Sequence, residues 1–228
     1  MAAPGRQRGA LVVADGDLPA RDSLDEAWPG WEAGIGLVVA ADGGALGAER
    51  LGFPIDLVVG DGDSLRESDF ERLVAAGVAV ERSPAEKDES DTELAVLAAI
   101  ERGATSIVIV GALGGRRVDH ALANVSLLAL RALGGRPCSI LDETARIRLL
   151  DGPGEMVTEG PPGSVVSLLP IGDVDGVTTE GLAYPLNDER LPMGPARGLS
   201  NIRRASRSRI AVRSGRLLVV ESPATLSP

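Results

Sequence analysis

The 228-residue sequence predicts an α/β domain followed by a small antiparallel β-sandwich. Up to about residue 142, short apolar runs alternate with helical stretches, which is typical of a mostly parallel, Rossmann-like sheet with helices on both faces. Beyond residue 145 the helical spacing disappears, and short alternating segments are separated by Gly and Pro. We therefore place the α/β domain at residues 1–143 and the β domain at residues 147–228.

Six apolar runs predict the strands of the first domain, at residues 10–14, 36–40, 55–59, 78–81, 106–110 and 138–141. Helical spacing lies between or after them, in the sets Phe70, Leu73 and Val74; Leu94, Leu97 and Ala98; and Leu122, Val125, Leu128 and Ala129. Short apolar strands separated by helices predict a parallel sheet. Ligands of such sheets gather at the carboxyl ends of the strands.

The second domain has predicted strands at residues 164–169, 176–179, 209–213 and 217–221. Its stretch from Arg197 to Arg216 carries seven arginines and no acidic residue. This stretch can be a solvated face of a sheet, or a basic surface that meets the acidic α/β domain of another subunit. The sequence alone leaves both interpretations open.

Composition excludes several classes of protein. The formal charge of −10 argues against a nucleic-acid binder, because such proteins hold phosphates with an excess of Lys and Arg. The sequence has no apolar run near the roughly 20 residues that cross a bilayer, and its first ten residues lack the apolar core of a signal peptide. We expect a cytoplasmic protein without a membrane partner. Cys138, the single cysteine, fits a small core residue better than a nucleophile.

Three acidic segments predict a site for Mg²⁺ and polyphosphate. Asp42-Gly43-Gly44 follows one predicted strand, the segment Gly60–Ser64 with Asp61 and Asp63 follows the next, and Lys87–Asp91 opens a helix. Lys87 is the only lysine among 23 basic residues, which indicates a position that favours a compact point charge. Carboxylates and one ammonium at strand ends are typical of Mg²⁺–phosphate sites.

Each acidic segment also has a purely structural interpretation. Asp-Gly pairs are common in turns, and Ser90 with Glu93 matches a helix capping box. Capping does not explain Lys87, because an ammonium at a helix start is unfavourable unless a negative group faces it. A bound phosphate would supply that charge.

Two further segments leave alternatives open. The Gly-rich turn Gly111–Arg117 can bind phosphates or a base edge, or Asp119 can simply cap the following helix. The turn is not a GxGxxG fingerprint, and the sequence has no Walker motif. In the β domain, Tyr184 can stack on a flat cationic ring or pack internally. Ser200-Asn201 can bind a heterocycle or form a turn.

Taken in order, these segments resemble the bacterial thiamine pyrophosphokinase (thiamine diphosphokinase) family. The family markers DGG, GDxDS, KDxTD, RxDHxLxN, GLxYPL and a late Ser-Asn correspond to Asp42–Gly44, Gly60–Ser64, Lys87–Asp91, Arg117–Asn124, Gly181–Leu186 and Ser200-Asn201. The resemblance spans nearly the whole chain. Two departures are visible. Ser90 replaces a Thr and keeps the hydroxyl, and Arg116 adds a second arginine, although the spacing to His120 favours Arg117 as the family residue.

The resemblance implies an enzyme that transfers a pyrophosphoryl group from ATP to thiamine, giving thiamine diphosphate and AMP. It implies Mg²⁺ bound by Asp61, Asp63 and Asp91, of which Asp91 also orients the acceptor hydroxyl or takes its proton. It further implies a homodimer, with thiamine between the α/β domain of one subunit and the β domain of the other. The remaining implied site residues are catalytic Lys87 and Asp88; nucleotide-binding Asp42, Gly43, Gly44, Ser64, Ser90, Gly114, Arg117, Asp119, His120 and Asn124; and thiamine-binding Tyr184, Leu186, Ser200 and Asn201.

Two other functions fit the same residues. One is a different Mg²⁺-dependent, nucleotide-using transferase, which would act on ATP or a sugar nucleotide without thiamine. The other is a non-catalytic sensor of thiamine or nucleotide, which would bind without turnover.

Overall fold

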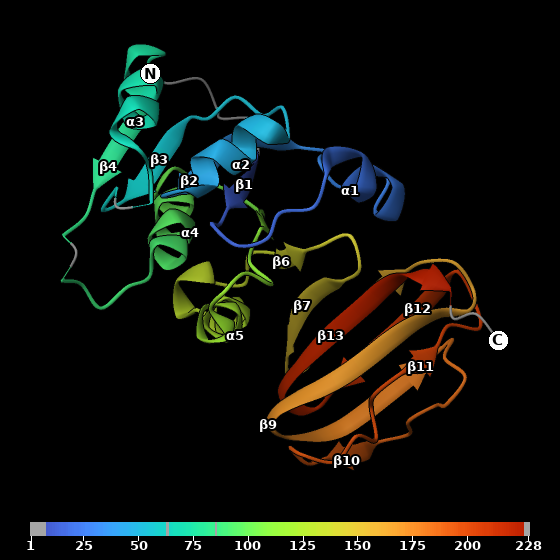
Figure 1. Cartoon of the computed structure of the whole chain (residues 1–228). Helices are drawn as coiled ribbons and strands as arrows, with labels where there is room; N and C mark the ends of the chain where they lie inside the picture. Colours follow the sequence, from blue (N-terminus) through green and yellow to red (C-terminus); the bar gives the residue numbers. More distant parts are fainter. Residues whose placement is uncertain (1–7, 63, 85, 226–228) are drawn as a thin grey trace, which may run out of the picture. The chain divides into compact units, whose positions relative to one another are not determined.

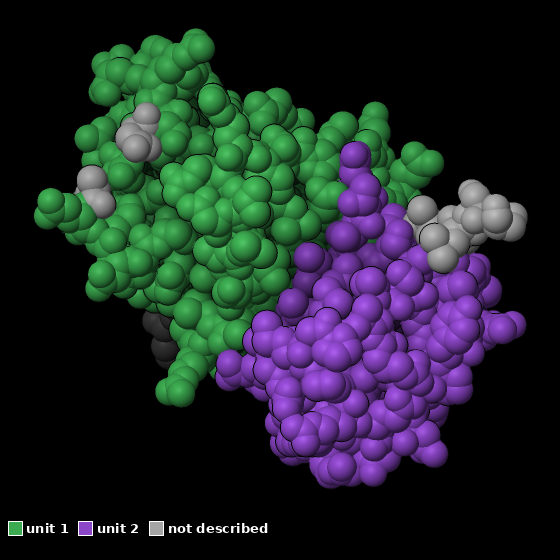
Figure 2. All heavy atoms as spheres, turned by 60° about the horizontal axis from the view of Figure 1, so that its bottom comes forward, with its two compact units in different colours: residues 1–142 green, residues 143–228 purple. Residues whose placement is uncertain are grey.

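The protein folds into two compact units that divide between Asp142 and Glu143 (Figures 1 and 2). The computed structural model describes residues 8–62, 64–84 and 86–225. All helices of these described residues belong to unit 1, whereas unit 2 is built from strands and loops. The predicted fold class, a parallel α/β part followed by an antiparallel β part, is confirmed.

Unit 1 contains a six-stranded sheet in which every pairing is parallel. The strands are β1 (Gly9–Val13), β2 (Ile35–Ala41), β3 (Leu57–Gly60), β4 (Ala79–Arg82), β5 (Ile107–Val110) and β6 (Cys138–Leu141), arranged in the order β4-β3-β2-β1-β5-β6. The chain moves outward from β1 to β4 and then returns to place β5 on the other side of β1. The strand order therefore reverses between β1 and β5, where a doubly wound sheet has its crevice.

Five α-helices accompany this sheet: α1 (Arg21–Ala27), α2 (Gly44–Arg50), α3 (Glu67–Ala75), α4 (Asp91–Glu101) and α5 (Val118–Ser126). Leu24 of α1 and Ala48 of α2 pack with Leu11 and Val38 of the sheet in one apolar cluster. The predicted helical face at Leu122 to Ala129 is divided, because α5 ends at Ser126 and a 3₁₀ turn, Leu127–Ala129, follows. A second 3₁₀ turn covers Arg131–Leu133.

Cys138 is the first residue of β6. Burial raises the pKa of its thiol to about 12, so this residue is protonated near neutral pH and fits the predicted core role.

Among the described residues, the structure contains no helix whose length and apolar content would let it cross a membrane.

Unit 2 is antiparallel throughout its described pairings. Its strands are β7 (Arg146–Asp151), β8 (Gly154–Glu159), β9 (Ser164–Glu180), β10 (Glu189–Leu191), β11 (Asn201–Ile202), β12 (Arg207–Val212) and β13 (Ser214–Thr225). The order is β7-β13-β9-β12-β8, with β10 and β11 also paired to β9. These strands enclose a core that includes Val166, Leu186, Ile210 and Val219.

The strands predicted at 164–169 and 176–179 are in fact one strand, β9. Its pairing with β13 shifts register between Ile171 and Asp175 but does not end. Gly172 and Gly176 have φ of 74° and 69°, a conformation that glycine adopts without steric cost. The break predicted between residues 169 and 176 is therefore a bulged region, which bends the strand and lets it continue.

The arginine-rich stretch of unit 2 is neutralised within the unit. Six of its seven arginines lie within ion-pair distance of a carboxylate, as Arg197–Glu189, Arg203–Glu221, Arg207–Glu159, Arg209–Glu155, Arg213–Asp188 and Arg216–Asp151. The sequence of residues 143–228 holds ten arginines and ten acidic residues, so its formal charge is zero. The structure favours a solvated, ion-paired face over a basic surface.

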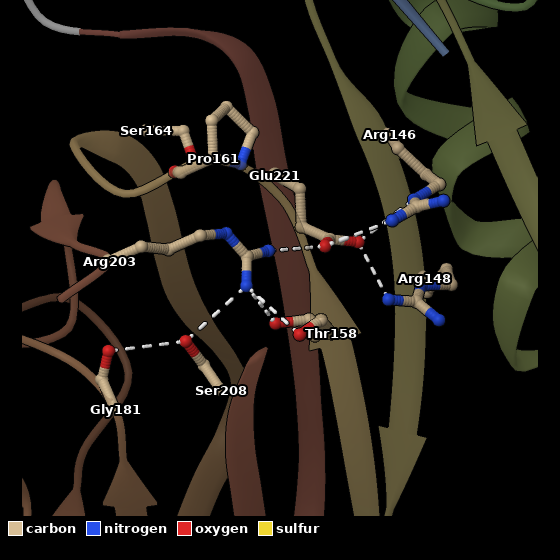
Figure 3. Close-up of polar contacts among 9 residues, drawn as sticks. All are labelled: Arg146, Arg148, Thr158, Pro161, Ser164, Gly181, Arg203, Ser208 and Glu221. Atoms are coloured by element: carbon tan, nitrogen blue, oxygen red, sulfur yellow. Dashed lines mark hydrogen bonds and ion pairs between the residues drawn. The ribbon is translucent and has the colours of Figure 1, made fainter. Parts of the chain in front are cut away.

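One of these ion pairs is buried (Figure 3). Glu221 is 1% exposed and accepts hydrogen bonds from Arg146 (2.9 Å), Arg148 (2.7 Å) and Arg203 (2.6 Å). Burial raises the pKa of Glu221, but the hydrogen bonds and charges of Arg146 and Arg148 outweigh it and leave the pKa below its ordinary value. Burial lowers the pKa of Arg203, and Glu221 offsets this effect only in part, so the pKa stays below its ordinary value.

We predict that Glu221→Gln destabilises the protein by roughly 3–5 kcal/mol at pH 7, because buried guanidinium groups lose their counter-charge. A lowered pKa in the folded state means that the unfolded chain binds the proton more tightly. The stabilisation by Glu221 is thus complete above the ordinary carboxyl range, near pH 4, and is lost as the pH falls below it. Denaturant unfolding from pH 7 to pH 3 should therefore show a weaker acid dependence in Glu221→Gln.

The control is Glu159→Gln, which removes the exposed pair with Arg207, in which both side chains are 70% exposed. Exposed pairs contribute little, so stability should stay close to that of the wild type. Equal losses in both variants would contradict the role of burial.

Candidate functional site

A cavity of about 760 Å³ lies at the carboxyl ends of the strands in unit 1, where the strand order reverses. This volume suits a nucleotide-sized ligand. Its lining comes from the loops after β1, β2, β3 and β5 and from the first turns of α4 and α5. Charges of both signs line it: Asp15, Asp42, Asp61, Glu89, Asp91 and Asp119, with Lys87, Arg116 and Arg117.

Asp42 joins the loops that follow β2 and β3. It is 3% exposed, and its Oδ2 accepts a hydrogen bond from the Ser64 amide at 3.0 Å. Its φ is 45°, a left-handed conformation that Asp tolerates better than most residues and that is common at functional sites.

Gly60 lets two of the predicted acidic segments approach each other. A methyl group added at Gly60 would lie 3.0 Å from Cβ of Asp42 and 3.3 Å from Oδ1 of Asp91. The carboxylate-bearing side chains after β2 and at the start of α4 therefore flank the last residue of β3. The absence of a side chain at this position is what allows them to converge.

The start of α4 combines a cap with an ion pair. Ser90 Oγ accepts from the Glu93 amide at 3.1 Å, as the capping box predicts. Lys87 Nζ donates to Asp91 Oδ1 at 2.5 Å and to Ser83 Oγ at 2.7 Å, and its side chain is 12% exposed. From the sequence, we expected a bound phosphate to supply the negative charge beside Lys87. In the structure, the carboxylate of Asp91 supplies it. The pair lines the cavity.

The opposite wall is held by contacts between the loops that follow β1 and β5. The Gly16 amide donates to the Gly111 carbonyl at 2.9 Å, and a methyl group at Gly16 would lie only 2.4 Å from that oxygen. The Gly115 amide donates to Oδ2 of Asp17 at 2.7 Å. These contacts require glycine at Gly16 and fix the rim where the strand order reverses.

The two arginines of this wall differ in their partners. Arg117 donates through Nε at 2.9 Å and Nη2 at 2.5 Å to the carboxylate of Asp119. These hydrogen bonds are the largest cause of the low pKa of Asp119, about 2. Arg116 also lines the cavity and makes no ion pair with the described residues. Of these two arginines, Arg116 is therefore the one whose charge has no carboxylate partner among the described residues.

Most of the predicted nucleotide-site residues come together in this cavity: Asp42, Asp61, Ser64, Lys87, Ser90, Asp91, Gly114, Arg117, Asp119, His120 and Asn124. Asn124 is 7% exposed and donates to the Ala112 carbonyl, so its amide holds the loop after β5. Gly43 and Gly44 lie at the start of α2, next to the cavity rather than in its lining. Asp88 is also absent from that lining, and Asp63 lies outside the described residues.

Asp15, Gly16 and Thr92 line the cavity and were not predicted from the sequence, whereas Glu89 and Arg116 lie within segments that were. Asp15 lies against α2, since a methyl group at Gly43 would come within 2.3 Å of its carboxylate. The signal was present in the sequence. Asp15-Gly16-Asp17 directly follows the apolar run of β1, as the other acidic glycine loops follow β2 and β3.

The predicted thiamine-binding residues belong to unit 2 and differ in exposure. Tyr184 is 57% exposed, and Ser200 is exposed with φ of 55°. Leu186 is 2% exposed and packs in the core, and Asn201 is 4% exposed. Tyr184 and Ser200 are thus the two whose side chains can reach a ligand.

The metal prediction depends on carboxylates of the cavity. The described residues contain no group of three or more His, Cys, Asp or Glu side chains arranged to hold a metal ion. Asp61 and Asp91 line the cavity, and their predicted third partner, Asp63, is not among the described residues.

Comparison with known proteins extends across both units. Residues 32–134 match the family profile "Thiamin pyrophosphokinase, catalytic domain", and residues 155–217 match "Thiamin pyrophosphokinase, vitamin B1 binding domain". The thiamine pyrophosphokinase of Bacillus subtilis (strain 168) is 30% identical over 189 residues, which cover 82% of this chain and 84% of the relative.

Solved structures are also similar to this chain across both units. The crystal structure of thiamine pyrophosphokinase from Bacillus subtilis has a TM-score of 0.80 at 27% identity and covers 94% of this chain and 99% of that one. A thiamin pyrophosphokinase family protein from Enterococcus faecalis has a TM-score of 0.80 at 26% identity, covering 95% of this chain and 100% of that one. Together with the matched profiles in both units, these relatives show that the chain belongs to the thiamin pyrophosphokinase family.

Proposed function

We propose that the protein transfers a pyrophosphoryl group from ATP to the hydroxyethyl oxygen of thiamine, giving thiamine diphosphate and AMP. The observation that carries this proposal is the cavity in which Asp42, Asp61 and Asp91, from three separate segments, line one space with Lys87. Membership of the family supports the same reaction.

The cavity of unit 1 is the ATP site in this proposal. Arg116 supplies positive charge toward the phosphates, Lys87 adds the part of its charge that Asp91 does not offset, and the amides at the start of α4 add donors. Arg117 is held by Asp119 and has less capacity to bind a phosphate. This assigns the larger share of phosphate binding to Arg116, although the spacing in the sequence favoured Arg117.

The donors of the cavity fit Mg²⁺, which prefers carboxylate oxygens. Asp61 and Asp91, with Asp63, would hold the ion, and Asp42 lies near Asp91 at Gly60. A bound Mg²⁺ would neutralise phosphate oxygens so that an alcohol can approach the phosphorus. Lys87 holds the carboxylate of Asp91 in place through Oδ1. Asp91 can then orient the acceptor hydroxyl or take its proton.

Unit 2 provides the thiamine contacts. The ring of Tyr184 offers a face on which the cationic thiazolium can stack, and the exposed hydroxyl of Ser200 can bond to a heterocycle. We place thiamine between unit 1 of one subunit and unit 2 of a second copy in a homodimer. Val118 and Leu122, one turn apart on α5, are 72% and 65% exposed and offer apolar surface for such an assembly.

The decisive experiment is to incubate the purified protein with ATP, Mg²⁺ and thiamine and to look for AMP together with thiamine diphosphate. Nucleotide turnover that does not require thiamine would favour a different transferase. Binding of both ligands without turnover would favour a sensor.

We predict that Asp63→Ala lowers the rate of AMP formation by about 10³-fold or more, because the site loses a metal ligand. Steady-state assays over a range of Mg²⁺ concentrations, with circular dichroism to confirm the fold, test this. Turnover close to wild type would remove Asp63 from the metal site.

We predict that Gly60→Ala strongly lowers kcat, since the added methyl group would meet Asp42 and Asp91. Gly103→Ala is the control. Gly103 follows the end of α4 and has positive φ, 80°, so alanine causes backbone strain there too, but its Cβ would enter open space. Both variants should lose about 1–2 kcal/mol of stability from this strain, and only Gly60→Ala should lose most activity. Similar activities in the two would contradict the convergence of carboxylates at Gly60.

We predict that Tyr184→Ala raises the thiamine KM by about tenfold or more and leaves the ATP KM unchanged, because a cation–π contact is lost. Tyr184→Phe keeps the ring and should retain most of the affinity. An unchanged KM in Tyr184→Ala would assign Tyr184 a packing role only.

A further inference from the structure

The backbone of Tyr184 is held by a single side chain. Asn201 Oδ1 accepts from the Tyr184 amide at 3.0 Å, and Asn201 Nδ2 donates to the Tyr184 carbonyl at 2.7 Å. Tyr184 is 57% exposed as a residue, so packing contributes little to the direction of its side chain. The two hydrogen bonds from Asn201 therefore fix the backbone position from which the tyrosine side chain extends.

Asn201 has little capacity left for a ligand. Its Oδ1 accepts a second hydrogen bond from the Ile202 amide at 2.9 Å, which with the Tyr184 bonds uses both acceptor positions and one of its two N–H donors. The residue is 4% exposed. This geometry is that of a group that orders its neighbours rather than one that contacts a substrate.

The strand that carries Asn201 is too short to be stable through its backbone pairing alone. β11 consists of Asn201 and Ile202, and it pairs with Val166 and Val165 of β9. The next residue, Arg203, points inward and is 2% exposed. Its Nη2 donates to Glu221 at 2.6 Å, and its Nη1 donates to the hydroxyl of Thr158 at 2.7 Å (Figure 3). Arg203 thus anchors β11 to β13 and β8.

Strand pairings connect the Arg203–Glu221 ion pair with the hydrogen bonds between Asn201 and Tyr184. Asn201 pairs with Val166 of β9, and Val166 pairs with Glu221 of β13. On the other side of β11, the Ala183 amide donates to the Ile202 carbonyl at 2.8 Å, and Leu182 forms a bridge with Arg203. These contacts connect Arg203 through β11 to residues 182–184.

Gly160 leaves the space that Arg203 occupies. A methyl group at Gly160 would lie 2.9 Å from Arg203 Nε. Glycine at this position therefore leaves room for the guanidinium, which lies between Gly160, Thr158 and Glu221. A buried ion pair gains little stability over an apolar replacement of both partners, although the loss of one partner alone is costly, and it can specify one arrangement of the backbone.

We propose that Asn201 and Arg203 are positioning residues for Tyr184: the Arg203–Glu221 pair fixes β11, and the amide of Asn201 on β11 fixes the backbone that directs the tyrosine ring. The part of this proposal that concerns substrate rests on the proposed contact between Tyr184 and thiamine. The part that concerns the ring does not, because the position of the ring can be observed directly.

The chain offers a direct probe, because Tyr184 is its only tyrosine. Full-length protein labelled with ¹³C at tyrosine gives ring resonances from this residue alone. Asn201→Ala removes both hydrogen bonds to Tyr184, and Arg203→Met removes the anchor. The control is Arg148→Met, which removes another hydrogen bond to Glu221, at 2.7 Å, from β7. It leaves β11 and its contacts in place.

We expect Asn201→Ala and Arg203→Met to shift the Tyr184 ring resonances and to raise the thiamine KM about tenfold, with kcat and the ATP KM within about twofold of wild type. Arg148→Met should lower the melting temperature without either effect. If Arg203→Met does not fold, Asn201→Ala still tests the proposal, because it leaves the Arg203–Glu221 pair intact.

Unmoved ring resonances in Asn201→Ala, or equal shifts in Arg148→Met, would overturn the proposal and leave the network a purely stabilising role. Failure of the thiamine assignment is distinguishable. In that case Tyr184→Ala itself leaves the thiamine KM unchanged, whereas the ring resonances still move in Asn201→Ala. If Tyr184→Ala raises the KM and Asn201→Ala changes neither the KM nor the resonances, only the positioning proposal fails.

Discussion

The common direction of the six strands in unit 1 is the constraint on which the candidate site depends. Because every pairing in this sheet is parallel, the loops after β1, β2, β3 and β5 all leave from the same edge. The reversal of strand order separates the loops of β1 and β5 and opens a cavity between them. Close approaches at Gly16 and Gly60 then bring the loops near enough for their carboxylates to share one space.

Unit 2 differs from unit 1, because successive antiparallel strands place their connecting loops at opposite ends of the sheet. Its candidate ligand contacts, Tyr184 and Ser200, lie on exposed segments with little packing of their own. Their positions must come from the interior, through hydrogen bonds to Asn201 and Ser167. The buried carboxylate of Glu221 adds side-chain links to the strand pairing, because it accepts hydrogen bonds from Arg146 and Arg148 of β7 and from Arg203 next to β11.

The sequence predicted what depends on local pattern and missed what depends on distant contacts. Apolar runs located the six parallel strands, and β6 agrees residue for residue because both of its ends are marked by composition. The division of β9 was wrong because a bulge glycine and a turn glycine look alike in sequence. Leu186 belongs to the same motif as Tyr184, yet its side chain packs in the core. A motif shows that a segment matters and not which of its side chains faces the ligand.

The distribution of charge places a condition on how a nucleotide can enter the cavity. Unit 2 is formally neutral, so the net charge of −10 belongs entirely to residues 1–142. Six carboxylates line the cavity against Lys87, Arg116 and Arg117, and two of these cations already face Asp91 and Asp119. A bare polyphosphate would meet net repulsion there. The same carboxylates attract a polyphosphate that carries a divalent cation, because the metal reverses the sign of the local field. The acidity of the cavity is therefore compatible with a nucleotide substrate on the condition that substrate and cation bind together.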